Sequence, residues 1–409
     1  MKRIEGGIVA PLGFKANGIF CGIKRSKRKD LMLLVSDVPC VSAGAFTSNQ
    51  VRAFCVDFNQ TQLRNGISQA LIVNSGNANC LTGKQGVQDT ETMAQEAATL
   101  LGLPRHMVLV ASTGIIGQPM PMKCVQDGLP ELHRGLDRTP EANLNACEAI
   151  LTTDRRVKFA ACEVVIQGKP VRIGLMAKGA GMIHPQMKMV GKKHATMLCF
   201  ITTDAHITHS ALSRILENVI NKSFNCMSVD ADMSTNDMTL ILANGLAKNR
   251  LIAKTGAASR IFEAALTELC QQMAKEMIQD AEGATKFVEI RVSGAKSEKD
   301  AKTVGLSIAS SKLVKTALFG CDPNWGRIAA SIGYANATVD AEKLKIKLGP
   351  HLVLKGRSRV ANKIKDLDKV FQAKKIDIDV DLGVGNHAST IWTTDLSTGY
   401  VEFNSAYRT

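Results

Sequence analysis

Two glycine-containing segments carry polar side chains that could act on an anion or on a carbonyl group. Residues 112–117, "STGIIG", lack the Gly-Lys-Ser/Thr ending that a phosphate-binding loop needs, but their backbone N–H groups could face the oxyanion that develops during acyl transfer. Residues 178–182, "KGAGM", place a cation beside two glycines, which suits the close approach of an anion. A plain surface turn explains residues 178–182 equally well, so spacing alone leaves both interpretations open.

Two further groups of residues have the types, but not the spacing, of metal ligands. His206 and His209 lie three apart, but a zinc site needs further ligands and none is evident nearby. Residues 230–237, "DADMSTND", have the oxygen ligands of a calcium loop without its glycine or its terminal glutamate. We therefore predict no metal site.

The elements that must position these residues alternate between strands and helices. Apolar runs predict a buried strand at 31–36, a strand at 70–73, and within 107–117 a strand that runs into a glycine-bearing turn. Apolar residues at helical spacing predict helices at 89–102, 210–221 and 259–279. Gly102 is expected to end the first helix, and the methionines of the last helix are expected to fill the core. Residues 287–292, 344–348 and 376–382 alternate with period two, so we expect half-exposed strands there and an α/β protein overall.

The composition limits the kind of protein. A chain of 409 residues is expected to fold into two or three domains, or into one large α/β unit with an appendage. Eleven scattered cysteines without a C-x-x-C pair, no secretory signal and no membrane-spanning run predict a cytoplasmic protein with reduced thiols. The net charge is +14, but the one dense basic run, "KRSKRK" at 24–29, has no interleaved aromatics and is interpreted as a solvated loop rather than a nucleic-acid contact.

A set of longer motifs resembles one family. In chain order these motifs are "GIK", "AGAFTSN", "IVNSGNAN", "VASTGIIG", "TTD", "KGAGMIHP", "ATMLCFITTDA", "TNDMTLILANG", "DAEGATK", "LVKTALFGCDPNWGRI" and "YVEFNSAYRT". Together they resemble the ornithine acetyltransferase family, the bifunctional glutamate N-acetyltransferases of arginine biosynthesis. The resemblance implies mixed sheets flanked by helices in a layered sandwich, with a second, smaller α/β domain.

The resemblance also implies a precursor that cuts itself between Ala195 and Thr196. The products would be an α chain of residues 1–195, with the oxyanion-stabilising residues and part of the substrate site, and a β chain of residues 196–409. Thr196 would become the nucleophile, because its new N-terminal amine can take the proton from the hydroxyl. An acetyl-Thr196 ester would then carry acetyl from N2-acetyl-L-ornithine to L-glutamate with ping-pong kinetics.

Individual roles carry over where the motifs match. Thr113 and Gly114 match the pair that stabilises the oxyanion. The positions that match the family's substrate contacts are Thr152, Lys178, Thr196, Glu282, Asn404 and Thr409. Thr153 is an alternative to Thr152, because both lie in "TTD". We expect Lys178 to pair with the substrate α-carboxylate and Glu282 to receive the ornithine ammonium.

The family further implies an α2β2 heterotetramer that acts on small molecules, without metal, cofactor, nucleic acid or membrane. Whether acetyl-CoA is a second acetyl donor stays open, since one-reaction and two-reaction members share these motifs. The alternatives are an uncleaved relative that only binds ligands, an amide hydrolase on the same scaffold and, on charge alone, a nucleic-acid-binding module. Retention of Lys178, Glu282, Asn404 and Thr409 favours an amino-acid acceptor over water.

The chain departs from the family pattern in three places. Seven residues, 188–194, are inserted before the scissile bond, and their composition predicts a mobile surface loop that the chemistry does not need. Alanine replaces the usual glycine at Ala231, and Lys312 stands where proline is common.

Overall fold

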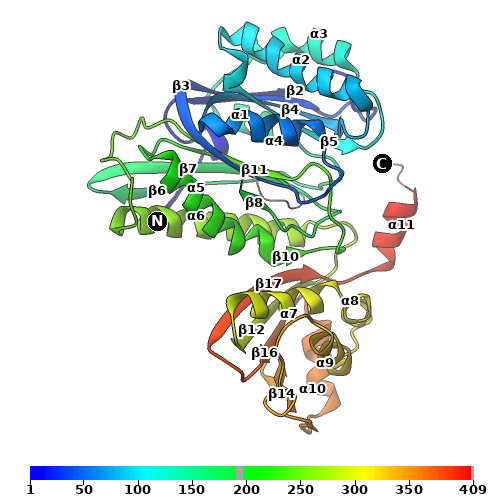
Figure 1. Cartoon of the computed structure of the whole chain (residues 1–409). Helices are drawn as coiled ribbons and strands as arrows, with labels where there is room; N and C mark the ends of the chain where they lie inside the picture. Colours follow the sequence, from blue (N-terminus) through cyan, green and yellow to red (C-terminus); the bar gives the residue numbers. More distant parts are fainter. Residues whose placement is uncertain (190–196, 407–409) are drawn as a thin grey trace.

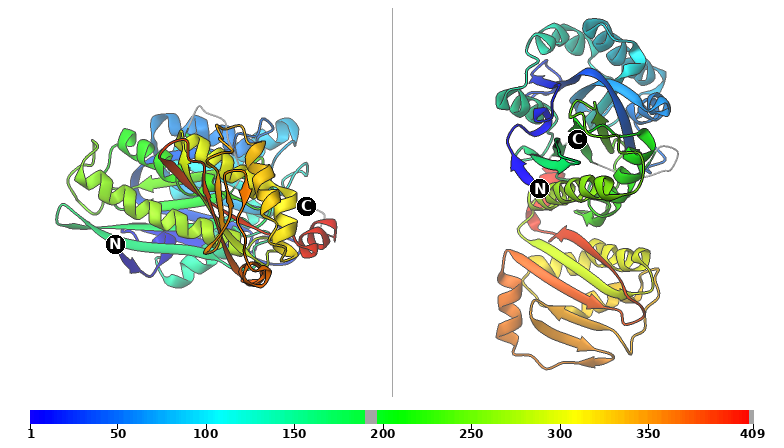
Figure 2. Two further views of the ribbon diagram at one scale, coloured as in Figure 1. Left: turned by 90° about the horizontal axis from the view of Figure 1, so that it is seen from below. Right: turned by 90° about the vertical axis from the view of Figure 1, so that its left-hand side faces the viewer.

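The computed structural model describes residues 1–189 and 197–406. These residues form two lobes, each built on one mixed sheet flanked by helices (Figures 1 and 2). The layered α/β architecture and the second, smaller domain are therefore confirmed. The predicted scissile pair Ala195–Thr196, the rest of the insertion at 190–194, and Thr409 lie outside the described residues.

The large lobe contains a ten-stranded sheet with the path β1-β6-β7-β9-β11-β3-β4-β5, in which β2 and β8 also pair with β3. Its strands are β1 (Lys2–Ile4), β2 (Phe14–Ile19), β3 (Leu31–Phe46), β4 (Ile67–Asn77), β5 (Val108–Ile115), β6 (Lys158–Ile166), β7 (Lys169–Lys178), β8 (Lys188–Met189), β9 (Leu198–Thr203) and β11 (Met238–Ala243). Both β9 and β11 lie between β7 and β3, so strands from beyond residue 196 are inserted among strands from before it.

Helices cover both faces of this sheet, which is why its central strands are apolar throughout. They are α1 (Phe54–Gln62), α2 (Gly83–Leu101), α3 (Met122–Arg134), α4 (Pro140–Ala149), α5 (His209–Asn221) and α6 (Ala257–Gln279), with short 3-10 segments η1 (Gly7–Val9), η2 (Leu63–Asn65), η3 (Arg105–Met107) and η4 (Phe224–Cys226). Along β9, Leu198 and Phe200 face one core while Cys199 and Ile201 face the other.

The small lobe contains a seven-stranded sheet with the order β10-β17-β12-β16-β13-β14-β15. Its elements are β10 (Met227–Ser228), β12 (Phe287–Ala295), α7 (Glu298–Ser310), α8 (Lys312–Phe319), α9 (Trp325–Gly333), β13 (Lys345–Leu348), β14 (His351–Lys355), β15 (Ser358–Arg359), α10 (Ile364–Gln372), β16 (Lys375–Asp381) and β17 (His387–Thr394). Helix α11 (Thr398–Ala406) then leaves the small lobe (Figure 1).

The period-two strands of the last third of the sequence are confirmed. In β12, β13 and β16 every second residue is buried, and the other face carries charged side chains. On that face Arg291 forms ion pairs with Glu289, Asp377 and Asp379 at 3.0, 2.7 and 2.9 Å. One face of the small sheet therefore meets solvent, as the alternation predicts.

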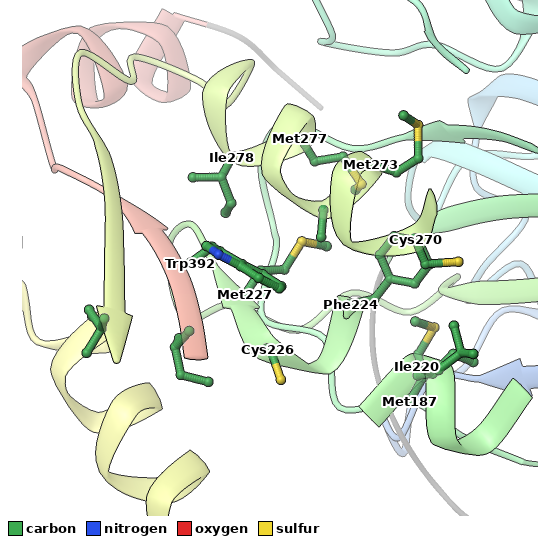
Figure 3. Close-up of a cluster of buried hydrophobic side chains, with 14 of the residues drawn as sticks. Met187, Ile220, Phe224, Cys226, Met227, Cys270, Met273, Met277, Ile278 and Trp392 are labelled. Atoms are coloured by element: carbon green, nitrogen blue, oxygen red, sulfur yellow. The ribbon is translucent and has the colours of Figure 1, made fainter. Parts of the chain in front are cut away.

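The long helix α6 fills the junction between the lobes with its methionines (Figure 3). Met273 and Met277 are fully buried, and Trp392 of the small lobe packs into the same cluster. Apolar residues recur every four positions from Ile261 to Met277, but they do not all share the buried face, because Ile261 is 43% exposed. Each step of four residues advances about 40° beyond a full turn of the helix, so residues spaced four apart leave the buried face after several steps.

Helix α2 ends as its sequence predicts. Gly102 follows Leu101 with a φ of +66°, a left-handed conformation that glycine adopts without steric cost. Lys312 is the first residue of α8, the helix position where proline is also well tolerated. Lysine at this position therefore leaves the local fold intact.

The expectation of a mobile loop over 188–194 is wrong for its first two residues. Lys188 and Met189 form β8 and pair with Phe46 and Ala45 of β3. The preceding residue, Met187, is held by two hydrogen bonds, one donated by its N–H to Asn225 Oδ1 and one accepted by its carbonyl from Asn225 Nδ2. The insertion therefore begins as an ordered continuation of the sheet.

Replacing Ala231 by glycine is expected to stabilise the protein. Ala231 has a φ of +66°, where a Cβ clashes with the backbone at a cost of about 1–2 kcal/mol. Glycine removes that strain but loses more conformational entropy on folding than alanine does. We therefore expect the free energy of unfolding in urea to rise by about 0.5–1 kcal/mol. Ala264→Gly, at an exposed position inside α6, is the control and should instead lose about 1 kcal/mol. A loss in Ala231→Gly would contradict the assigned strain.

Candidate active site

Strand pairing brings Lys178, a predicted substrate residue, to the start of β9. Lys178, the last residue of β7, pairs with Leu198, the first residue of β9. On the other side, Met238 N donates a 2.7 Å hydrogen bond to Met197 O. The insertion lengthens the chain between Lys178 and β9, but the two remain neighbours in space because β7 and β9 pair directly.

Three predicted residues meet around the Lys178 ammonium group. Its Nζ donates to Thr152 Oγ1 at 2.7 Å and to Thr113 Oγ1 at 3.4 Å. Of the two neighbouring threonines, Thr152 is therefore the one that joins the cluster. All three side chains are largely buried but keep some accessibility, with Thr113 and Lys178 at 9% and 8% exposure. A cation and two hydroxyls at a buried surface suit an anionic substrate group.

Gly114 lies beside this cluster in a conformation that only glycine adopts readily. Its φ is +135°, and a Cβ there would come within 2.3 Å of the carbonyl carbon of Gly76 on β4. Gly114 and Gly76 are paired in the β4–β5 register. This tight backbone contact fixes the strand backbone at Thr113 and Gly114, as an oxyanion-binding segment requires.

A buried ion-pair network holds the segments that carry the cluster. Lys158 Nζ, which is fully buried, donates to Asp154 Oδ1 at 2.8 Å and to Asp280 Oδ2 at 2.5 Å. Asp154 also accepts hydrogen bonds from Thr152 N at 3.2 Å and Gly179 N at 2.7 Å. The network thereby ties together the segments that carry Thr152, Lys178 and the end of α6.

The charges in this network shift one another's pKa values. Burial by itself raises the pKa of Asp154, but attraction to Lys178 and Lys158 and the hydrogen bonds outweigh burial, so the net pKa is lowered and the carboxylate is ionised. Burial lowers the pKa of Lys178, and attraction to Asp154 opposes this effect. The site is thus a desolvated, polarised environment, which is typical of catalytic centres.

Glu282 and Asn404 form a second group next to the first. Asn404 Nδ2, on α11, donates to Glu282 Oε2 at 3.0 Å. Glu282 N in turn donates to Ala180 O at 3.0 Å, within the "KGAGM" segment. A Cβ at Gly181 would lie 2.3 Å from Glu282 Oε2. The glycines of this segment therefore let the carboxylate approach the backbone that follows Lys178.

Asp230, the first residue of the acidic segment 230–237, has a structural role. Asp230 accepts hydrogen bonds from Met182 N and Ile183 N at 2.6 and 2.9 Å, and from Tyr400 Oη on α11 at 3.2 Å. This arrangement anchors α11, and with it Asn404, to the site. Among residues 1–189 and 197–406, no three His, Cys, Asp or Glu side chains are grouped to hold a metal ion. No described helix is long and apolar enough to cross a membrane.

The comparison with known proteins decides the family. The ArgJ family model matches residues 15–409. The chain belongs to the ArgJ family. A relative named arginine biosynthesis bifunctional protein ArgJ, from Symbiobacterium thermophilum, is 43% identical over 411 residues and covers 100% of both chains. A relative of the same name from Synechococcus sp. is 41% identical over 418 residues, covering 100% of this chain and 99% of its own.

A solved structure shares the fold. The crystal structure of arginine biosynthesis bifunctional protein ArgJ from Bacillus halodurans is 39% identical, with a TM-score of 0.50, and the match covers 52% of this chain and 100% of that chain. For this ArgJ family chain, the structure brings together Thr113, Gly114, Thr152 and Lys178 as one group and Glu282 and Asn404 as its neighbour.

Sequence reasoning missed the residues that hold this ArgJ site in place. Lys158 and Asp280 are 122 residues apart, and no local pattern connects them. In the sequence, Asp154 and Lys158 are opposite charges four residues apart. That pair of charges next to the "TTD" motif was the one available signal.

Thr113→Ala is expected to fold and to slow turnover in this ArgJ family chain. Loss of one donor at an oxyanion site typically costs on the order of a hundredfold to a thousandfold in kcat. The variant also removes the Thr113 contact with Lys178, whereas Thr113→Ser keeps a hydroxyl and should retain most activity. Steady-state kinetics of both variants check this result, and an unchanged kcat in Thr113→Ala would remove Thr113 from the site.

Asp237 is a further residue that sequence reasoning missed. Both carboxylate oxygens are buried without a hydrogen-bond partner among the described residues, directly before Met238, which bonds to Met197 O. Burial raises the pKa of Asp237 well above its usual range, and the positive charge of Lys178 opposes this shift. A raised pKa favours the protonated form, and a protonated carboxyl group can donate a hydrogen bond.

Asp237→Asn is expected to change how stability depends on pH. Because the folded pKa of Asp237 is raised, the native state binds more protons than the unfolded state above about pH 4, and the free energy of unfolding falls as pH rises. One such group contributes at most about 1.4 kcal/mol per pH unit. Asparagine does not titrate, so urea unfolding between pH 5 and 8 should show a smaller decline in the variant. Exposed Asp232→Asn is the control, and parallel curves for parent and Asp237→Asn would contradict the assignment.

Proposed function

We propose that this chain is a glutamate N-acetyltransferase that moves acetyl from N2-acetyl-L-ornithine to L-glutamate in arginine biosynthesis. The names of its full-length relatives support the pathway. The observation that carries the proposal is the convergence of Lys178, Thr113 and Thr152 at the start of β9. In the sequence, Thr196 directly precedes Met197, the described residue next to that strand end.

The proposed reaction needs a nucleophile, a base and an oxyanion site. The Thr196 amine accepts the hydroxyl proton while Oγ1 forms a bond to the acetyl carbon. Thr113 and Gly114 stabilise the oxyanion, the C–N bond of acetylornithine breaks, and the proton leaves with the ornithine amine. The glutamate amine then attacks the ester, the C–O bond breaks, and the threonine hydroxyl regains a proton. No metal or cofactor takes part in this proposal.

Substrate binding follows from charge. The Lys178 ammonium pairs with the α-carboxylate that both substrates share, and Glu282 receives the ornithine side-chain ammonium. Glutamate brings a carboxylate to the same place, where it would repel Glu282. Asn404, whose amide contacts Glu282, supplies a donor there. For the assembly we propose an α2β2 heterotetramer, which sedimentation of the purified protein would measure.

Mass spectrometry and steady-state kinetics test this proposal together. The purified protein should contain two chains that separate at Ala195–Thr196, and initial rates with acetylornithine and glutamate should give parallel double-reciprocal lines. An intact 409-residue chain without transfer would indicate the binding-protein alternative instead. Acetate release that does not depend on glutamate would indicate the hydrolase.

A further inference from the structure

The side chain of Asn236 joins two parts of the large lobe that are distant in the sheet order. Asn236 lies two residues before β11, and its Nδ2 donates hydrogen bonds to Ala78 O and Ser112 O, each at 2.7 Å. Its Oδ1 accepts a third hydrogen bond from Thr235 Oγ1 at 2.5 Å. Asn236 is only 4% exposed, so its amide group is used inside the protein and not for contacts with solvent.

The curl of the large sheet makes this contact possible. In the sheet order, β3 and β4 stand between β11 and β5. The long strand β3 pairs with β4 through residues 31–41 and with β11 through residues 41–46, so the sheet turns back on itself. Asn59 of α1 lies at the same place, because its Nδ2 is 2.7 Å from Val110 O of β5 and 3.5 Å from Met238 Sδ of β11. The edge strand β5 therefore lies next to the start of β11.

Two buried asparagines take the place of a further strand along the outer edge of β5. Val110 N donates to Asn59 Oδ1 at 3.0 Å, and Val110 O accepts from the same side chain. Every second residue of a strand turns its backbone polar groups to the same edge, so Ser112 follows Val110 along it. The Ser112 carbonyl is the one that Asn236 binds. Asn236 thus holds β5 directly before Thr113.

This hydrogen bond fixes the backbone at which Thr113 begins. The Ser112 carbonyl and the Thr113 N–H belong to one peptide unit, which is planar and moves as a whole. Two residues after Asn236, Met238 N donates to Met197 O at 2.7 Å, next to the start of β9. One short segment therefore contacts both the backbone before the oxyanion residues and the backbone that leads into β9.

We propose that Asn236 is a positioning residue for acetyl transfer, which holds Thr113 at a fixed distance from the start of β9. The inference rests on the proposed acetyl transfer at Thr196. Asn236 itself exchanges no proton and binds no substrate, because it acts through the peptide unit between Ser112 and Thr113. In the proposed cleaved enzyme Asn236 belongs to the β chain and Ser112 to the α chain, so this contact also couples the two chains at the site.

Asn236→Ala is expected to lower kcat by about tenfold to a hundredfold, because a shift of the oxyanion donor by about 1 Å has a cost of this order. The Lys178 ammonium is held by Thr152 at 2.7 Å and keeps its place, so the KM for acetylornithine should change by less than about twofold. Rates are expressed per cleaved chain, which intact-mass measurement counts. This separates an effect on turnover from an effect on self-cleavage.

Asn249 provides the matched control, because its amide makes the same kinds of hydrogen bond elsewhere in the lobe. It is 2% exposed, accepts from His206 N at 2.8 Å, and donates to His206 O and Arg250 O at 3.2 and 2.8 Å. Asn249→Ala should lower the urea midpoint about as much as Asn236→Ala does, but leave kcat within about twofold. An equal loss of kcat in the two variants would reduce Asn236 to a structural residue and overturn the proposal.

A double variant identifies the group through which Asn236 acts. In a Thr113→Ala background, Asn236→Ala should lower kcat by no more than about threefold, because the hydroxyl that it positions is already gone. Losses that simply multiply would show that Asn236 does not act through Thr113. If Asn236→Ala does not accumulate as folded protein, Asn236→Ser, which keeps one donor, gives the same comparison with a smaller loss.

The parent enzyme separates this inference from the proposed function. An active parent whose kcat survives in both Asn236→Ala and Asn236→Ser would overturn only the positioning role. A parent that transfers no acetyl from acetylornithine to glutamate would refute the proposed function and the positioning role together.

Discussion

Thr196→Ala is expected to yield an intact 409-residue chain that transfers no acetyl group. The proposed role of the hydroxyl is double, because it attacks its own preceding peptide bond during cleavage and the acetyl donor during turnover. Without a hydroxyl, neither acyl ester can form. Intact-mass measurement and the acetylornithine assay on the same preparation give the two readouts.

Thr196→Ser is the matched control for this prediction. Serine keeps the hydroxyl next to the amine, so this variant should still produce two chains and measurable transfer. Two chains and normal turnover from Thr196→Ala would show that another residue is the nucleophile. The nucleophile would then have to be sought among the other residues around Thr113, Lys178 and Glu282.

Lys158→Met is expected to lower the free energy of unfolding by about 3–5 kcal/mol. The substitution keeps an apolar stem of similar length but leaves the buried Asp154 and Asp280 carboxylates without the cation between them. Urea unfolding followed by circular dichroism measures the loss. Lys169→Met, at the exposed start of β7, should change stability by less than about 0.5 kcal/mol.

A second substitution separates lost packing from uncompensated charge. Adding Asp280→Asn to Lys158→Met removes one of the two stranded carboxylates and should recover part of the stability. Catalysis should fall in the single variant as well, because Asp154 also orders Thr152 N and Gly179 N. A loss below about 1 kcal/mol in Lys158→Met would show that the network contributes little to the fold.

Local patterns in the sequence were sufficient to predict the helices and strands whose formation depends on neighbouring residues. The helical spacing that ends at Gly102 and the alternation from Phe287 to Val292 reflect periodicities of the backbone itself, so both elements could be predicted. Strand β8 could not, because two residues that pair with distant Phe46 and Ala45 have no periodicity to detect. Its order comes from β3 and from the Asn225 contacts with Met187.

The candidate site likewise has residues that the sequence identifies and contacts that only the fold creates. The motifs identified Thr113, Lys178 and Glu282 through the resemblance, but not how they meet. Lys178 reaches the start of β9 through an antiparallel register that spans the whole insertion. Asp237 was dismissed along with a failed calcium loop, because its burial arises from strands β3, β9 and β11 packing together rather than from its neighbours in sequence.

The position of β9 and β11 between β7 and β3 sets an order of events during synthesis. Until residue 203 has emerged from the ribosome, the large sheet lacks β9 and the edge of β7 stays unpaired; until residue 243 has emerged, it lacks β11 and the facing edge of β3 stays unpaired. The pairing of Lys178 with Leu198 needs β9, so the proposed self-cleavage would follow the folding of this strand pair instead of preceding it. Residues 1–195 produced alone would expose those edges and aggregate, and joint production of the two segments would be needed to recover a soluble protein.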